Sequence, residues 1–330
     1  HDASVKLATT SSGVTVTGTL DASSQVLVGT NDSIFAENNI RFKPSGGAFI
    51  DHNTTGQNIN FRLSNSSSLD VTPLVISPTA ITTAVNVDVT GKINGVGILA
   101  DTTNFVDSIL ISQDGGTGTL SSASHNVGIG DNVFNVLTSG INNTGMGADA
   151  LKQLTSGNQN TAVGKSAGDA LTTGSFNVFI GDAAGDAVTT ADSNVAIGQN
   201  ALTNTTTGAT NTAVGRQALQ TNTTASNNTA VGNQSLLNNT TGASNTAVGA
   251  GSMDANTTGG SNTSLGKDSL GANTTGASNV ALGHNSLESN TTASNNTAAG
   301  KSALAGNTTG GNNTAIGREA LLSNTTGGFN

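Results

Sequence analysis

A histidine beside an aspartate is the most reactive grouping in this sequence. Asp51, His52 and Asn53 are adjacent, and a carboxylate next to an imidazole serves both metal binding and acid–base catalysis. A solvated strand end explains the group more simply, and we favour that interpretation. His125 and His284 occupy repeat positions that other units fill with varied residues, so we expect both on the surface.

Four aspartates form a second candidate cluster, where Gly168 and Gly185 replace a recurring leucine. A cation site and a solvated acidic face both fit such a cluster, and we favour the solvated face. The aspartates are Asp169, Asp182, Asp186 and Asp192. The Gly-Gly-Thr-Gly segment at 115–118 lacks the Lys-Ser/Thr ending of a phosphate-binding loop and predicts a linker. We therefore assign no catalytic, cofactor-binding, metal-binding or receptor-binding residue, and we expect no cofactor.

The composition argues against several further classes of function. The 330 residues include 43 glycines but no cysteine, tryptophan or tyrosine, and only 9% are charged. The net charge of −9 argues against electrostatic binding of nucleic acid or anionic lipid. Without cysteine there is no disulfide framework and no thiol nucleophile. Because no apolar run reaches the roughly 20 residues of a membrane span, we expect no membrane insertion.

The elements that would position these side chains follow from a strict repeat. The pattern Asn-x-x-aliphatic-Gly begins at Asn126 and recurs every 17 residues, which gives twelve units over 126–329. Its consensus is Asn-Thr-Ala-Val-Gly-x-x-Ala-Leu-x-x-Asn-Thr-Thr-Gly-x-Asn, and we number these positions 1 to 17. Asn330 would open a thirteenth unit, and the chain begins at His1 without a methionine. We therefore expect a fragment of a longer protein.

The unit predicts one coil of a parallel β-solenoid. Its Asn, Thr and Gly content makes a poor helix, and helical repeats are usually about twice as long. We expect a short strand at positions 2–4, a corner at the invariant glycine of position 5, a second segment at positions 8 and 9, and a polar turn at positions 12–15. Stacked asparagines at position 1 should form amide ladders.

The threonine and asparagine columns also allow two functional interpretations, ice binding and glycosylation, which we do not favour. Adjacent threonines at positions 13 and 14 cannot share one strand face, and this argues against an ice-binding surface. Asn-x-Thr triplets such as those at Asn222 and Asn239 would be glycosylation sites in a eukaryotic secretory protein. In a phage or bacterial product they are only turn residues.

Faces of the coil are assigned from variability. Position 4 is apolar in all units and is expected to point into the core, whereas variable position 6 should face solvent. We therefore expect Val231→Asp, and Gly232→Val at the corner, to disrupt the stack. Asn233→Asp should cost little.

The apolar content of one coil is small. Two large apolar side chains per coil contribute about 1.5–3 kcal/mol each on burial, whereas ordering each residue costs about 1.5 kcal/mol. A core shared among several chains would add burial, which favours an oligomer, and we expect a trimer.

The repeats resemble those of known fibres. Asn211-Thr-Ala-Val-Gly-Arg-Gln-Ala-Leu and the following Asn222-Thr-Thr-Ala-Ser-Asn look like head repeats of trimeric autotransporter adhesins, although those units are usually shorter. They look more like arrays of bacteriophage tail fibres. The resemblance covers residues 126–330, implies a trimeric β-roll shaft or head, and carries over no catalytic residue.

Three regions follow from these patterns. Residues 1–100 are expected to form a β-rich fibre module, because Val-Thr-Val-Thr-Gly at 14–18 and Val-Asp-Val-Thr-Gly at 87–91 alternate like copies of one strand–turn–strand element. Residues 101–125 are expected to connect this module to the array at 126–330.

The expected protein is therefore an all-β, elongated fibrous homotrimer, with an N-terminal β-rich module followed by a parallel β-roll or β-solenoid. We expect a structural and adhesive fibre, most simply a phage tail fibre that positions host-receptor binding. The alternative is a bacterial surface adhesin or extracellular filament. Expected partners are identical chains, a host-cell surface glycan or protein receptor, and other virion tail proteins, at the virion tail or the extracellular surface. An enzyme such as a capsule depolymerase would need a carboxylate pair in a groove, and the array offers no recurrent pair.

Overall fold

The structure is a computed structural model that describes residues 92–93, 96–102, 105–112 and 117–330. The chain divides into two units, His1–Thr82 and Thr83–Asn330, and every described residue belongs to the second. Most of the expected N-terminal module at 1–100, including His52 and its neighbours, lies outside the described residues. The expected division into 1–100, 101–125 and 126–330 stays a prediction.

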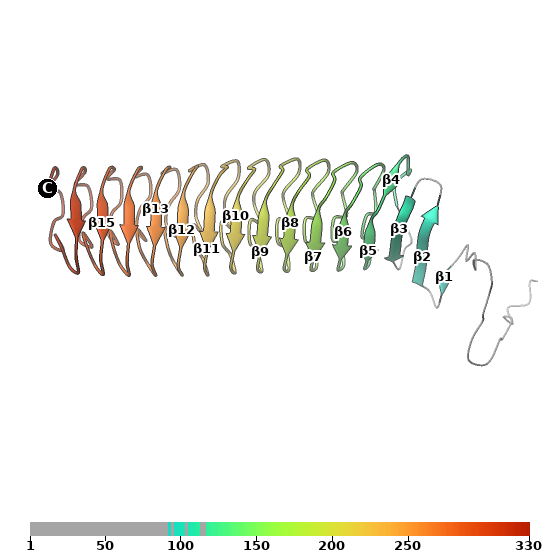
Figure 1. Ribbon diagram of the computed structural model, residues 1–330, viewed down its shortest axis with the longest axis horizontal. Coiled ribbons are helices and arrows are strands. Elements are labelled where there is room, and N and C mark those ends of the chain that lie inside the picture. Colours follow the sequence, from blue (N-terminus) through green and yellow to red (C-terminus); the bar gives the residue numbers. More distant parts are fainter. Residues whose placement is uncertain (1–91, 94–95, 103–104, 113–116) are drawn as a thin grey trace, which may run out of the picture. The chain divides into compact units, whose positions relative to one another are not determined.

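The described part of the chain contains strands and turns but no helix. Sixteen strands form one sheet (Figure 1). They are β1 Lys92–Ile93, β2 Val96–Thr102, β3 Phe105–Ser112, β4 Ala123–Ser124, β5 Val127–Ile129, β6 Thr144–Met146, β7 Thr161–Val163, β8 Val178–Ile180, β9 Val195–Ile197, β10 Thr212–Val214, β11 Thr229–Val231, β12 Thr246–Val248, β13 Thr263–Leu265, β14 Val280–Leu282, β15 Thr297–Ala299 and β16 Thr314–Ile316.

Strands β5 to β16 are the parallel, in-register strands of a β-solenoid. Each is three residues long and pairs with the equivalent residues of the next coil, as Thr212 pairs with Thr229 and Val214 with Val231. The pairing offset is 17 residues throughout the array, so each repeat is one coil (Figure 1). The expected all-β solenoid with a 17-residue coil and a strand at positions 2–4 is confirmed.

A longer strand begins the stack. Strand β3 pairs antiparallel with β2 and parallel with both β4 and β5, so that Leu110 lies opposite Gly128. The backbone N–H of Asn126 donates to the Ser108 hydroxyl at 2.7 Å. Ser108 and Leu110 therefore contact positions 1 and 3 of the first coil. In each later coil, the preceding coil makes these contacts.

The corner glycine has a conformational reason for its invariance. Position 5 glycines have φ between 120° and 146°, which side-chain-bearing residues rarely adopt. A Cβ at Gly232 would also lie 2.5 Å from the carbonyl oxygen of Gly249 in the next coil. Position 5 therefore requires glycine for two reasons, its positive φ and the close approach of the backbone of the next coil.

The segment after the corner consists of turns. Positions 7, 9 and 17 have positive φ even where they are not glycine, and buried Leu219 at position 9 has φ 51°. The Leu219 N–H donates to Ser235 of the next coil at 3.0 Å, and the Asn222 N–H donates to the Leu219 carbonyl at 3.2 Å. Because these bonds recur in successive coils, stacking stabilises a left-handed conformation that leucine rarely adopts alone.

The core is formed by positions 1, 3, 8, 9, 12 and 15, which are buried in nearly every coil. In the seventh unit the inward strand residue is Ala230, whereas Val231 at position 4 is half-buried. The expectation that position 4 points into the core is therefore wrong. Successive strand residues point to opposite faces, and the small residue at position 3 is the one that fits the narrow interior.

Buried asparagines at position 1 form the expected amide ladder. Asn143 Nδ2 donates to Asn126 Oδ1 at 3.1 Å and to the Gly157 carbonyl at 2.9 Å, and the Asn143 N–H donates to the same Asn126 oxygen at 2.9 Å. The pattern repeats from coil to coil, as in the bonds from Asn160 to Asn143 at 2.9 and 3.0 Å. These bonds satisfy most of the amide groups in the column, which would be costly to bury alone; among the described residues, the Nδ2 of Asn296 is the ladder atom that is buried without a partner.

Large core side chains are matched by glycines. Buried Phe179 takes position 3, where other coils have a small residue, and a Cβ at Gly168 or Gly185 would lie 2.7 or 2.5 Å from its ring. Phe134 takes position 9, and a Cβ at Gly128 would lie 3.0 Å from its ring. Gly168 and Gly185 therefore replace leucine to make room for Phe179, which keeps the interior closely packed.

Candidate functional site

The outward face of the strands is the most distinctive surface of the array. We call it the outer strip and define it as positions 2 and 4 of β5 to β16, the two strand positions that point away from the core. None of these side chains is buried and none is charged. Position 2 is Val127, Thr144, Thr161, Val178, Val195, Thr212, Thr229, Thr246, Thr263, Val280, Thr297 and Thr314; position 4 is Ile129, Met146, Val163, Ile180, Ile197, Val214, Val231, Val248, Leu265, Leu282, Ala299 and Ile316.

Large aliphatic groups of the outer strip face solvent. Ile129 and Met146 each expose 41% of their surface, and Leu265 exposes 51%. Twelve coils at a spacing of about 4.8 Å make the strip about 58 Å long, and its two columns lie about 7 Å apart. The strip therefore covers roughly 400 Å², in which the position 4 column is aliphatic in every coil and the position 2 column is threonine in eight of the twelve.

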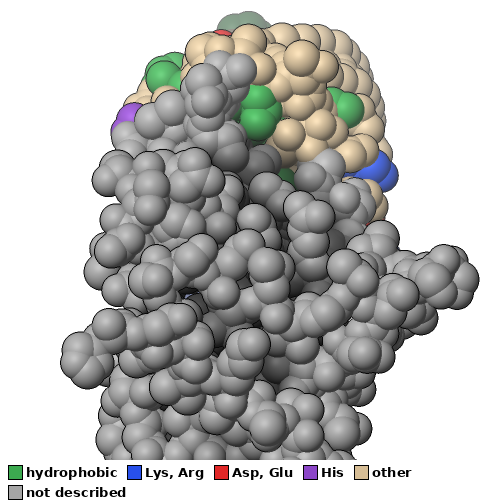
Figure 2. Space-filling model, turned by 90° about the vertical axis from the view of Figure 1, so that its right-hand side faces the viewer, with side chains coloured by type: hydrophobic (Ala, Val, Ile, Leu, Met, Phe, Trp, Pro, Cys, Tyr) green, Lys and Arg blue, Asp and Glu red, His purple; other side chains and the backbone are tan. Residues whose placement is uncertain are grey.

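The surface around the array is otherwise polar and carries few charges. Position 6 is exposed in eleven of the twelve units and half-buried at Ala148, so the assignment of this column to solvent is confirmed. In the end view of Figure 2, backbone and uncharged polar atoms cover most of the visible described surface, with a few separate apolar and charged groups. The outer strip is thus a continuous uncharged surface with an unbroken aliphatic column at position 4, on a chain with 9% charged residues.

The threonine pair divides between two environments. Position 13 is half-buried, and Thr155 Oγ1 donates to the Thr172 carbonyl of the next coil at 3.0 Å. Its neighbour at position 14, Ser156 in this coil, is exposed. The expectation that adjacent threonines do not share one face is confirmed. Asn222 and Asn239 are buried and hydrogen-bonded to each other at 3.0 Å, so neither amide is accessible to glycosylation in the folded coil.

The four aspartates are divided among three columns. Asp169 and Asp186 are both at position 10, Asp182 is at position 6 and Asp192 is at position 16, where its carboxylate accepts the Ser175 N–H at 2.6 Å. In the part of the chain that the structure describes, no three His, Cys, Asp or Glu side chains are placed to hold a metal ion. The glycines that suggested an unusual site, Gly168 and Gly185, are explained by Phe179.

Burial affects the position 10 carboxyls. Desolvation raises the pKa of Asp169, and desolvation together with the nearby Asp169 charge raises the pKa of Asp186. Asp149 behaves oppositely: hydrogen bonds from Lys152 and Asn132 lower its pKa, and the Lys152 Nζ lies 3.1 Å from its carboxylate. These groups form a half-exposed charged patch, and no reactive pair follows from their geometry.

The outer strip is the feature that sequence reasoning assigned to the wrong side. Its signal is present in the sequence, because position 3 is always Gly, Ala or Ser except at Phe179. A uniformly small strand position indicates a tight interior, which leaves the larger neighbours on the outside. Of the remaining candidates, His125 and His284 are both exposed, as expected. Asp51, His52 and Asn53 lie outside the described residues, and so do Gly115 and Gly116.

No protein-family model matches the chain, and no curated protein or solved structure matches it either. Among the described residues, the structure contains no helix of the length and hydrophobicity needed to cross a membrane.

Proposed function

We propose that the array is the shaft of an elongated fibre whose chains associate side by side through the outer strip as a parallel homotrimer. The observation that carries this proposal is the strip itself, an uncharged face whose position 4 column is aliphatic in all twelve coils. Burying it against identical chains removes it from water, and burial of apolar area is the main driving force of association. The threefold stoichiometry follows the resemblance to adhesin heads and tail-fibre arrays.

The fibre is proposed to act without catalysis. Each coil is bonded to its neighbours by strand pairing, by the asparagine ladder and by the position 13 threonines, which suits a stiff element that extends and positions a contact. We propose a bacteriophage tail fibre that brings other virion tail proteins to a host-cell surface glycan or protein receptor. Its place would be the virion tail.

A bacterial surface adhesin or extracellular filament is the second candidate, because the same array would serve as an adhesive stalk there. The complete gene distinguishes the two. A secretion signal with a membrane anchor would support the adhesin, whereas a virion-attachment segment with a terminal chaperone would support the tail fibre. Immunogold electron microscopy of purified virions would give independent support for the tail fibre or refute it.

The association is tested by placing charges on the outer strip. Val214→Asp, Val231→Asp and Val248→Asp together alter three adjacent position 4 residues that point away from the core. We expect the wild-type chain to sediment at three times its 32.4 kDa mass and the triple variant at a single mass with an unchanged β-type circular dichroism spectrum.

The matched control places the same charges at position 6. Gln199→Asp, Asn233→Asp and Ala250→Asp alter three exposed side chains, and the assembly should persist. A wild-type chain that sediments at one chain mass, or two triple variants that behave alike, would refute the proposed association.

A further inference from the structure

The last four coils place one basic side chain each in the same column. In the eight earlier units position 6 is basic only at Lys165 and Arg216, which are not in adjacent coils. With His284 counted as neutral, these four coils carry three cations and three acids and are therefore neutral within a chain whose net charge is −9. We call the four basic side chains the basic column; its members, all exposed, are Lys267, His284, Lys301 and Arg318.

The backbone holds the basic column at a regular spacing. The backbone N–H of the residue after a column member donates to the carbonyl of the column member in the preceding coil. These bonds join Asn285 to Lys267 at 3.1 Å, Ser302 to His284 at 2.9 Å and Glu319 to Lys301 at 2.9 Å. These bonds set neighbouring members about 4.8 Å apart, the spacing of paired strands. An extended acidic polysaccharide advances by a similar distance per sugar, so its acidic groups can recur at spacings that match the coils.

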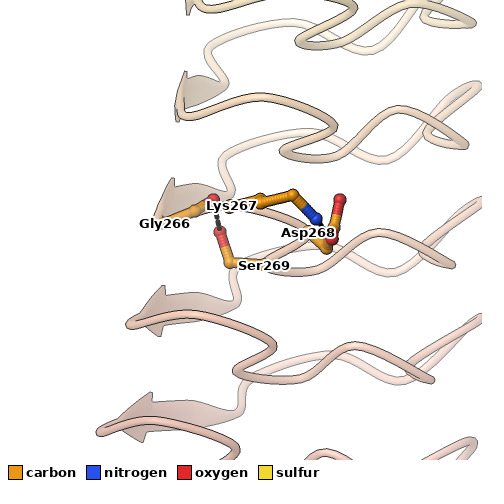
Figure 3. A network of polar contacts seen from close by, with 4 residues as sticks. All are labelled: Gly266, Lys267, Asp268 and Ser269. Atoms are coloured by element: carbon orange, nitrogen blue, oxygen red, sulfur yellow. Dashed lines mark hydrogen bonds and ion pairs between the residues drawn. The ribbon is translucent and has the colours of Figure 1, made fainter.

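Three acidic side chains lie in the same four coils as the basic column, and two of them pair with its members at the exposed surface. Lys267 pairs with Asp268, the next residue in the chain (Figure 3), and Arg318 pairs with Glu319 at 2.9 Å. Exposed pairs of this kind contribute about 0–1 kcal/mol, so an anionic ligand can displace the carboxylate. Among the described residues no salt bridge involves Lys301, and Glu288, at position 10, is the remaining acid of these four coils.

We propose that the basic column binds a linear acidic polysaccharide, with the sugar chain running parallel to the stack of coils. Carboxylate or sulfate groups would accept charge-assisted hydrogen bonds from the lysine and arginine side chains. Binding would be sensitive to salt because all of these side chains are exposed. The inference rests on the proposed adhesive function, since it names the class of cell-surface molecule that the fibre contacts.

Polygalacturonate, which carries one carboxylate per sugar, is the probe for this binding. Lys267→Gln, Lys301→Gln and Arg318→Gln together should weaken its binding to the full chain about tenfold or more at low salt, the sum of three exposed charge contacts. The control Lys165→Gln with Arg216→Gln removes two isolated position 6 charges and should change affinity by less than about twofold. Asp268→Asn with Glu319→Gln frees two members of the column and should strengthen binding.

Binding of other polymers tests which chemical groups the basic column recognises. Dextran sulfate binding that is lost in the same triple variant would support a site for acidic polysaccharides in general. Equal binding of neutral pullulan, binding of duplex DNA as tight as that of polygalacturonate, or an unaffected triple variant would each overturn the proposal. Sedimentation of the same samples distinguishes the two proposals: an intact assembly that binds no polygalacturonate refutes only the basic column, and a monomer that binds it refutes only the fibre.

Discussion

The first four coils and the last seven share one backbone but have different interiors. In units one to four, position 12 is the apolar column Leu137, Leu154, Leu171 and Val188, and the phenylalanines Phe134 and Phe179 fill the core. In units six to twelve, position 12 is a ladder of asparagines, in which Asn256 Nδ2 donates to Asn239 Oδ1 at 2.8 Å and to Gly259 at 3.0 Å. Thr205 in unit five lies between the two columns.

This difference shows which parts of the coil are fixed and which are interchangeable. The corner glycine and the position 1 asparagine are identical in both regions, because they set the backbone path and its hydrogen bonds. The interior accepts leucine, asparagine or phenylalanine as long as the neighbouring positions match in volume and polarity. Whether a core residue is tolerated therefore depends on the residues that it packs against in the neighbouring coils.

The largest predicted effect is at the aromatic core of the first region. Phe179→Ala should leave a cavity beside Gly168 and Gly185 and destabilise these coils by about 3–5 kcal/mol. Adding Gly168→Leu and Gly185→Leu should restore most of the loss, because leucine occupies this position elsewhere with φ between 48° and 54°. Guanidinium unfolding with amide exchange in these coils measures both effects.

The reverse change in the second region provides the control. Ala213→Phe introduces a ring at position 3 between the buried leucines Leu202 and Leu219, and overpacking should cost about 1–3 kcal/mol or more. If Ala213→Phe were harmless, or if the two leucines failed to rescue Phe179→Ala, the matching of volumes between neighbouring coils would be refuted.

The corner should respond equally in both regions. Gly164 and Gly232 have φ of 135° and 136°, and a Cβ on either would lie 2.5 Å from the next glycine carbonyl. We expect Gly164→Ala and Gly232→Ala each to destabilise by at least about 1–3 kcal/mol, the cost of a strained backbone conformation. Thermal melting and limited proteolysis compare them, and a loss confined to one region would contradict a shared corner.

Breaking the second asparagine ladder should have a moderate effect. Asn256→Leu removes the acceptor of the Asn273 side chain, which donates to it at 2.8 Å, and removes the donor to Asn239. Leaving these buried groups without partners should cost about 1–3 kcal/mol. Replacing Asn239, Asn256 and Asn273 with leucine together should cost less than three times the single loss, because several partners disappear at once. Strict additivity in unfolding measurements would contradict a cooperative ladder.

The smallest predicted effect concerns the acids of the first region. The raised pKa values of Asp169 and Asp186 mean that the folded state binds protons more tightly, so their contribution favours folding below the unfolded pKa of about 3.9 and is lost as pH rises through the folded values. Asp169→Asn with Asp186→Asn should therefore stabilise the array near neutral pH by less than about 1 kcal/mol.

This gain should disappear at about pH 3, where both carboxyls are protonated. Asp254→Asn in the second region is the control: burial also raises the pKa of Asp254, but backbone hydrogen bonds oppose the rise, so the gain should be smaller. Melting temperatures at the two pH values measure these differences. A variant that is destabilised near neutral pH would contradict the assigned direction.

The coil could be predicted from the sequence because its strongest constraints are local. Period, strand, corner glycine and position 1 ladder follow from a 17-residue pattern with an invariant Gly and Asn, and all were confirmed. The orientation of position 4 could not be obtained from hydrophobicity alone, since Val231 is apolar and yet lies outside a core that admits only Ala230. Left-handed leucines such as Leu219 were also missed, because hydrogen bonds between coils override the local preference of the residue.

The most direct test of the outer strip as the association surface uses the absence of cysteine from the chain. Val231→Cys places a single thiol on the strip, and Thr241→Cys places one on the exposed position 14 column of the same coil. In a parallel, in-register assembly the strip thiols of neighbouring chains lie at the same height and should form disulfide-linked chains on mild oxidation, whereas Thr241→Cys should remain uncrosslinked. Crosslinking of Thr241→Cys without crosslinking of Val231→Cys, or the absence of crosslinks in both, would contradict the account.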